Sequence, residues 1–93
     1  MPARLFMTET DRTITFNVPR NAFLLRGVVV SFVVENKGRK PHRFAIMGHS
    51  TRTIAPGKTA RTTFIIFNTR GRFLFYDPLH RTSKTLRGYL TIE

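Results

Sequence analysis

Apolar and polar residues alternate along several short segments of the chain, and a period of two predicts β-strands. Segment 13–18 (TITFNV) alternates in this way, whereas segment 27–36 (GVVVSFVVEN) is apolar on both faces and long for one strand. The predicted strands are 13–18, 27–36, 42–47, 59–68, 71–76 and 87–92. No segment has a convincing run of apolar residues at helical spacing, so the pattern predicts an all-β chain.

Turn residues separate these segments. Asn36-Lys37-Gly38, Pro56-Gly57 and the stretch 68–71 (NTRG) are typical turn sequences. Six or seven short strands in 93 residues predict one domain, residues 1–93, with the architecture of a β-sandwich or β-barrel of about seven strands.

The composition excludes several classes of protein. The chain has no cysteine, which rules out disulfides, zinc–thiolate sites and thiol catalysis. No apolar run approaches the roughly 18 residues that a membrane span needs. The first residues, MPARLFMTET, lack the apolar region of a secretory signal. Neither a Gly-rich phosphate loop nor a meaningful triad-like spacing is present, so we expect no enzyme.

The charge is strongly positive, with 16 Lys and Arg against five acidic residues and a net charge of +11. Such a charge attracts an acidic protein, a nucleic acid or anionic lipid. The basic residues are spread along the chain and form no motif that favours one of these partners. A surface kept soluble by like charge is the alternative interpretation.

The order of several short motifs resembles the cupredoxins, the family of blue-copper proteins. The first half of the chain has a Pro near a strand end, a long strand that ends in Asn, and a His-x-Phe-x-Ile segment. The second half has a Pro-Gly turn, an aromatic strand and a closing Leu-x-Gly-x-Leu-x-Ile segment. The matching residues are Pro19, Gly27, Asn36, His42, Phe44, Ile46, Pro56, Gly57, Gly71, Phe73, Phe75, Tyr76, Leu86, Gly88, Leu90 and Ile92. The resemblance covers residues 16–92 and implies a Greek-key β-sandwich.

The resemblance also implies where a metal would lie. By position, His42 and His80 match the two histidine ligands, Asp77 stands at the cysteine, and Thr85 or Leu86 stands at the methionine. A blue-copper site depends on a copper–thiolate bond, which aspartate cannot supply. Two imidazoles and a carboxylate would instead suit Cu(II), Zn(II) or Fe(II) with water completing the shell.

Each of these residues also has a purely structural interpretation. His42 shares a strand face with Phe44 and Ile46 and would then be a polar cap over the core. Asp77 precedes Pro78, and its carboxylate would bond backbone N–H groups of the loop or pair with Arg72 or Arg81. His80 would be an unliganded loop residue, and we expect His49 to lie in a surface loop.

Three functional hypotheses follow. The first is a non-catalytic, metal-free cupredoxin-like domain, an accessory subunit that docks an acidic protein through basic loops, with Arg81, Lys84 and Arg87 as the predicted contacts. The second is weak, non-blue binding of copper or another divalent ion by His42, Asp77 and His80. The third is a basic β-domain that binds nucleic acid through its interleaved Arg and aromatic residues. The resemblance implies a periplasmic or secreted location.

Overall fold

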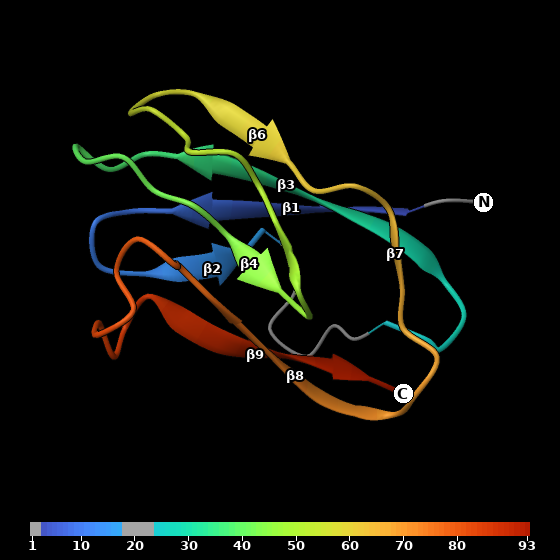
Figure 1. Ribbon diagram of the computed structural model, residues 1–93. Helices are drawn as coiled ribbons and strands as arrows, with labels where there is room; N and C mark the ends of the chain where they lie inside the picture. The colour runs from blue at the N-terminus through green and yellow to red at the C-terminus, as the bar shows by residue number, and fades with distance from the viewer. Residues whose placement is uncertain (1–2, 18–23) are drawn as a thin grey trace.

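The computed structural model describes residues 3–17 and 24–93, which form two β-sheets (Figure 1). The first sheet has the order β2-β1-β3-β6, and β7 also pairs with β3. Its strands are β1 (Ala3–Glu9), β2 (Ile14–Phe16), β3 (Val29–Asn36), β6 (Thr59–Arg61) and β7 (Ile65–Ile66). The second sheet has the order β5-β4-β8-β9. Its strands are β4 (Ala45–Ile46), β5 (His49–Ser50), β8 (Gly71–Tyr76) and β9 (Arg87–Ile92).

One pair of neighbouring strands in the first sheet is parallel. β1 pairs with β3 in parallel from Ala3↔Val30 to Glu9↔Asn36, whereas the other paired strands run antiparallel. A parallel pair needs a connection that crosses over, and here the chain returns through β2 before it enters β3. The two sheets confirm the predicted all-β fold, and of the two predicted architectures, sandwich and barrel, the structure has the sandwich. The described part of the chain contains no helix, and therefore none that is long and apolar enough to cross a membrane.

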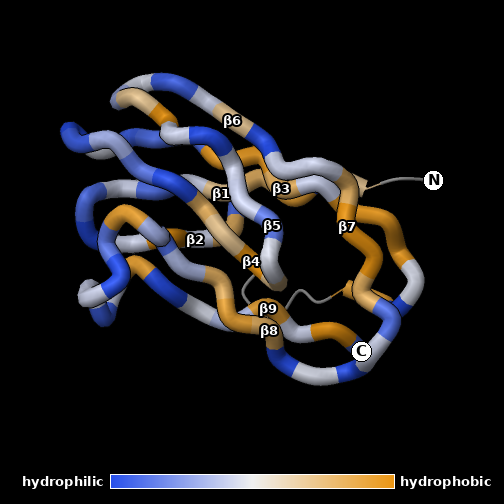
Figure 2. Tube along the Cα trace, viewed as in Figure 1, coloured by the Kyte–Doolittle hydropathy of each residue, from blue (hydrophilic) through white to orange (hydrophobic). Residues whose placement is uncertain are grey.

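Aromatic side chains from both sheets fill the space between them. Phe32 of β3 lies with its ring centroid 5.4 Å from that of Phe44 and 6.3 Å from that of Phe67. Phe44 in turn lies 5.5 Å from Phe75 of β8. These four rings are at most 3% exposed, so they form the centre of a continuous core. Hydrophilic residues, blue in Figure 2, gather in the loops at the end of the sandwich where β1 and β3 finish.

The strand boundaries differ from the prediction in several segments. β8 and β9 match the predicted segments 71–76 and 87–92. Segment 27–36 contains the single strand β3, which begins at Val29, two residues later than predicted. Segment 59–68 was predicted as one strand but forms two, because the Thr62 hydroxyl accepts the hydrogen bond of Phe32 N–H (3.0 Å) between them. Segment 42–47 was also predicted as a strand and shortens to β4, preceded by an isolated bridge between His42 and Ile54.

β1 (Ala3–Glu9) is not among the strands predicted from the sequence. Leu5 and Met7 face inward in this strand, but Phe6 is 54% exposed and Glu9 is fully buried. Because an aromatic residue is exposed and an acidic residue is buried, the sequence of β1 lacks the apolar–polar alternation that marks a half-buried strand. His49, predicted to lie in a loop, belongs to the two-residue strand β5, although it is exposed as expected.

The predicted strand 13–18 shortens to β2 (Ile14–Phe16). Its last predicted residue, Val18, and the motif residue Pro19 lie outside the described residues, which leave a gap at 18–23.

Candidate metal centre

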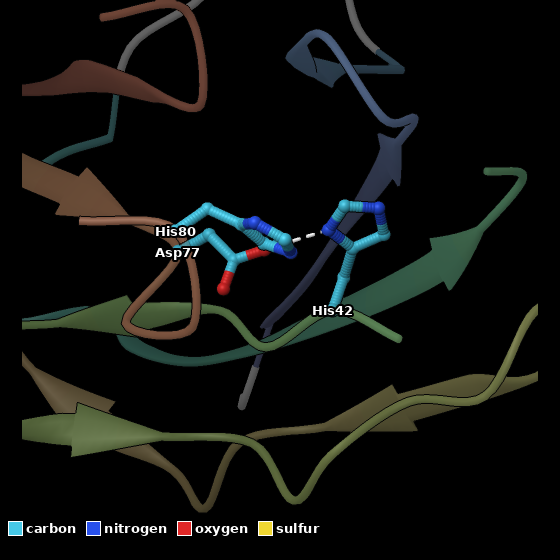
Figure 3. Close-up of side chains that lie close together, drawn as sticks. All are labelled: His42, Asp77 and His80. Atoms are coloured by element: carbon cyan, nitrogen blue, oxygen red, sulfur yellow. Dashed lines mark hydrogen bonds and ion pairs between the residues drawn. The ribbon is translucent and has the colours of Figure 1, made fainter. Parts of the chain in front are cut away.

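The three residues predicted as metal ligands lie together at one end of the sandwich (Figure 3). His42 precedes β4, and Asp77 follows β8 directly. The pairing Ala45↔Tyr76 therefore brings the two segments side by side. His80 lies in the loop after Asp77. One ligand atom from each of the three side chains lies within 4.8 Å of the others.

His42 is enclosed by carboxyl groups. Its Nδ1 lies 2.7 Å from Asp77 Oδ2 and 3.1 Å from Glu9 Oε2, and its Nε2 lies 2.8 Å from Asp11 Oδ1. The imidazole is fully buried. Three of the five acidic residues of this basic protein thus surround one histidine. The interpretation of His42 as a cap on the core is correct for its position, but it does not explain this shell of carboxyl groups.

Glu9 is the most unusual member of the cluster. It ends β1 on the inward face, beside Asn36 of β3, and is fully buried. As a carboxylate it has no hydrogen-bond donor for either oxygen. Burial, followed by a hydrogen bond to Asp77 and the charge of Asp77, raises the pKa of Glu9 to about 10. For the metal-free protein we therefore expect the Glu9 carboxyl group to be neutral at pH 7.

Asp11 holds the other side of the His42 ring. Its carboxylate accepts hydrogen bonds from the backbone N–H of Arg39 (2.9 Å) and Lys40 (3.1 Å). The Arg39 amide, together with His42, lowers the pKa of Asp11 to about 2. Asp11 is therefore an anion that accepts from His42 Nε2–H, which fixes the orientation of the ring.

Asp77 bonds the loop backbone as well as His42. Its Oδ1 accepts from Leu79 N–H (2.8 Å) and Arg43 N–H (3.2 Å), as one of the structural interpretations predicted. Burial raises the pKa of Asp77, but hydrogen bonds from Glu9, His42 and these amides outweigh burial, so its pKa is lowered. Within residues 3–17 and 24–93, the ion pair of Asp77 is with His42 and not with Arg72 or Arg81.

Of the remaining candidate residues, His80 lies beside His42, Leu86 belongs to the core and Thr85 is exposed. His80 is half-buried, with its ring centroid 4.9 Å from that of His42 and its Nε2 3.3 Å from Pro41 O. At the methionine position, Leu86 is only 2% exposed and belongs to the core, as expected for a residue that cannot ligate. Thr85 is exposed, with its hydroxyl 3.3 Å from that of Ser83.

The donor set fits a divalent cation but not blue copper. Two ligand atoms bound to one metal ion at about 2.1 Å and at right angles lie about 3 Å apart. The distances of 2.7 and 3.1 Å from His42 Nδ1 to Asp77 and Glu9 are close to this spacing. Imidazole and carboxylate are ligands for Zn(II), Cu(II) and Fe(II), and no thiolate is present.

Glu9 and Asp11 were missed because the sequence gives no local sign of them. Both precede the segment that carries the clearest motifs, and they are 33 and 31 positions from His42. The only available signal was the rarity of acidic residues in a chain of this charge.

Substitution of Gly38 is expected to displace Asp11. A Cβ atom at Gly38 would collide with Asp11 Oδ1 and lie 2.9 Å from its backbone nitrogen. We expect Gly38→Ala to lower the free energy of unfolding by about 1–3 kcal/mol, since it separates Asp11 from His42 Nε2. Urea denaturation measures the loss. A loss below about 0.5 kcal/mol, as for an ordinary surface substitution, would contradict the expectation.

Comparisons by sequence identify no relative: no protein family matches the chain. No curated protein matches it either. Comparison of structures does find similar proteins. A multicopper oxidase has a TM-score of 0.64 and 14% identity, over 99% of this chain and 44% of its own.

Two other structures are similar. The Cu-containing nitrite reductase (NirK) of Thermus scotoductus SA-01 has a TM-score of 0.70 and 15% identity, over 100% of this chain and 28% of that chain. Na-dithionite-reduced auracyanin from the photosynthetic bacterium Roseiflexus castenholzii has a TM-score of 0.76 and 10% identity, over 100% of this chain and 98% of that chain. The chain therefore has a cupredoxin-like fold, and it spans less than half the length of the first two proteins.

Proposed function

We propose that this cupredoxin-like domain binds a divalent cation in a non-blue site formed by His42, Asp77 and His80. The observation that carries the proposal is that one ligand atom of each of these three side chains lies within 4.8 Å of the others, with the Glu9 carboxyl group 3.1 Å from His42 Nδ1. A nitrogen lone pair and two carboxylates repel one another unless a positive charge lies among them. Protons supply that charge in the metal-free protein, and a cation would supply it in the bound form.

The surroundings of the cluster support this proposal. A histidine that binds a metal usually donates its other ring N–H to a carboxylate or carbonyl group, which orients the imidazole. Asp11 has that position at His42 Nε2, at 2.8 Å. Asp77 is also held through its second oxygen by two backbone amides. The groups that would contact the cation are thus oriented in advance.

The donor set argues against electron transfer. Reversible cycling of copper in this fold class rests on a thiolate ligand, and imidazole with carboxylate favours the divalent state. When bound, a divalent ion would supply positive charge and Lewis acidity. We infer a non-catalytic binding role, since the described residues outside the cluster present no nucleophile paired with a base.

Cation binding can be measured directly. We expect Zn(II) and Cu(II) to bind with one-to-one stoichiometry in calorimetric titrations. The Cu(II) form should give a weak d–d absorbance and no intense blue band. His80→Ala should weaken binding at least about tenfold, because it removes one of the few ligands. His49→Ala removes an exposed imidazole outside the cluster and is the matched control.

Three outcomes would refute the proposal: no stoichiometric binding of Zn(II), Cu(II) or Fe(II), equal effects of His80→Ala and His49→Ala, or a deep blue copper form that cycles at an electrode. Electron paramagnetic resonance of the Cu(II) form adds an independent readout. Nitrogen hyperfine coupling from two imidazoles is expected, and it should fall to one in His80→Ala.

A metal-free interaction domain is the second candidate function. The hydrogen bond between His42 Nδ1 and Asp77 Oδ2, 2.7 Å long, is complete with a proton alone. In that case the cluster is a structural replacement for a metal, and the basic surface of the domain carries the function. The titrations above distinguish the two candidates, since this one predicts binding of an acidic partner without any cation.

We extend the proposal to a location outside the cytoplasm, which rests on the resemblance alone.

A further inference from the structure

The outer face of β8 and β9 carries an unusual set of side chains. Alternate residues of these strands point away from the core, and the antiparallel register places Leu74 opposite Tyr89 and Tyr76 opposite Arg87. We call this surface the Arg–Tyr face and define it by Arg72, Leu74, Tyr76, Arg87 and Tyr89. It contains both tyrosines of the chain. Leu74 and Tyr89 are 39% and 55% exposed, although both are large and partly apolar.

Arg72 and Tyr89 form a preorganised pair on this face. The Arg72 guanidinium carbon lies 4.8 Å from the centroid of the Tyr89 ring, which is a cation–π contact. Stacking on the ring restricts the guanidinium and leaves its N–H groups free to point outward. A guanidinium held in this way is suited to bind a carboxylate through two parallel hydrogen bonds.

The positive charge continues from the face into the loop after β8. Arg87 donates from Nη2 to Arg81 O (3.3 Å), which joins the sheet to the loop that carries Arg81 and Lys84. Neither β8 nor β9 contains an acidic residue. At the far end, Glu93 Oε2 lies 3.8 Å from Arg70 Nη2, so the nearest acid along the strands is already beside a cation.

We propose that the Arg–Tyr face is a docking surface for an acidic segment of a partner protein, with carboxylates on Arg72 and Arg87 and an apolar side chain over Leu74 and Tyr89. Arg and Tyr are the residues that most often dominate binding at protein interfaces, and such interfaces have an apolar centre with a polar rim. Here Leu74 and Tyr89 are the centre. The basic residues of the loop and strands are the rim. The inference does not depend on cation binding in the cluster.

The same observations favour a protein over a single-stranded nucleic acid. A nucleic acid of this kind stacks successive bases on open aromatic rings. On this face the Arg72 guanidinium already lies over Tyr89, and Tyr76 is only half-exposed. The other aromatic residues of β8, Phe73 and Phe75, pack in or against the core. These residues therefore give little support to nucleic-acid binding through interleaved Arg and aromatic residues.

Binding of a defined probe tests the proposal. The probe is a short synthetic peptide rich in Glu with interspersed Leu, titrated into the ¹⁵N-labelled protein and followed by amide chemical shifts. We expect shifts confined to β8, β9 and the loop between them. Arg72→Glu should weaken binding about tenfold or more, because it both removes and reverses a contact charge. Tyr89→Ala should weaken it about threefold to tenfold.

The matched control is Arg61→Glu, which changes net charge equally on the exposed outer side of β6 in the other sheet. It should change the affinity less than twofold. Shifts spread over both sheets, or equal effects of Arg72→Glu and Arg61→Glu, would show attraction by net charge alone and overturn the proposal. Tighter binding of a poly-dT oligonucleotide of the same charge, lost in Tyr89→Ala, would overturn it in favour of a nucleic acid.

Discussion

Replacing His42 by alanine is expected to abolish cation binding and to lower the free energy of unfolding of the metal-free protein by about 3–5 kcal/mol. The reason is electrostatic. The His42 ring is fully buried, with Asp77 Oδ2 2.7 Å from its Nδ1 and Asp11 Oδ1 2.8 Å from its Nε2. Without the imidazole, the buried carboxylate of Asp77 keeps its backbone amides but loses the ring that faces its other oxygen. Urea denaturation in the presence of a chelator measures the loss.

A double-mutant cycle separates this effect from the cavity that alanine leaves. In the His42→Ala background, Asp77→Asn removes the uncompensated charge while an amide of similar shape remains. We therefore expect Asp77→Asn to cost at least about 1 kcal/mol less there than in the wild-type background. His49→Ala should be close to neutral. Additive losses, or a loss below about 1 kcal/mol for His42→Ala, would show that the cluster is not held by charge.

Replacing Glu9 by glutamine is expected to change how stability depends on pH. The pKa of Glu9 is raised from 4.5 to about 10 in the folded protein. Between these values the folded state holds a proton that the unfolded chain has released, so the free energy of unfolding falls as the pH rises. The slope from one such proton is at most about 1.4 kcal/mol per pH unit. Asp11 and Asp77 have lowered pKa values and act in the opposite direction only in the acid range below 3.8.

Glutamine resembles the protonated acid, because its amide N–H can still donate to Asp77. We expect Glu9→Gln to match the wild type near pH 5 and to be progressively more stable toward pH 9, in chelator. Denaturant midpoints at several pH values measure the divergence. Glu35→Gln, which changes a partly exposed acid in the same sheet, is the control. Parallel pH profiles for Glu9→Gln and the wild type would mean that Glu9 is ionised in the fold.

Much of the candidate site was predictable, because the order of the strands in a β-sandwich determines which candidate ligands lie close together. The strand 71–76 ends at Asp77, and the segment from His42 to Ile46 was expected to pair nearby. Once the resemblance fixed which strands are neighbours, the closeness of His42, Asp77 and His80 followed. The same reasoning predicted the core role of Phe44 and Ile46, which are fully buried.

β1 was not predictable in this way, although it supplies Glu9, the buried carboxyl group beside His42 Nδ1. β1 pairs in parallel with β3, a contact between segments that are separated by β2 and a long connection. Local pattern gives no information on such pairing, because the same alternation fits several neighbours. Only the register Glu9↔Asn36 puts the Glu9 side chain on the inner face beside His42.

The sequence by itself determined the class of the fold, the absence of a thiolate and the positive charge, because these depend on residue types and short-range periodicity. The resemblance to cupredoxins implied in addition that a carboxylate stands at the position of the sulfur ligand. Only the tertiary structure decided that His42 is enclosed by Glu9, Asp11 and Asp77, and that both tyrosines share one outer face with Arg72 and Arg87. The physical reason is that a pKa and a docking surface depend on neighbours in space, which strand pairing between distant segments sets.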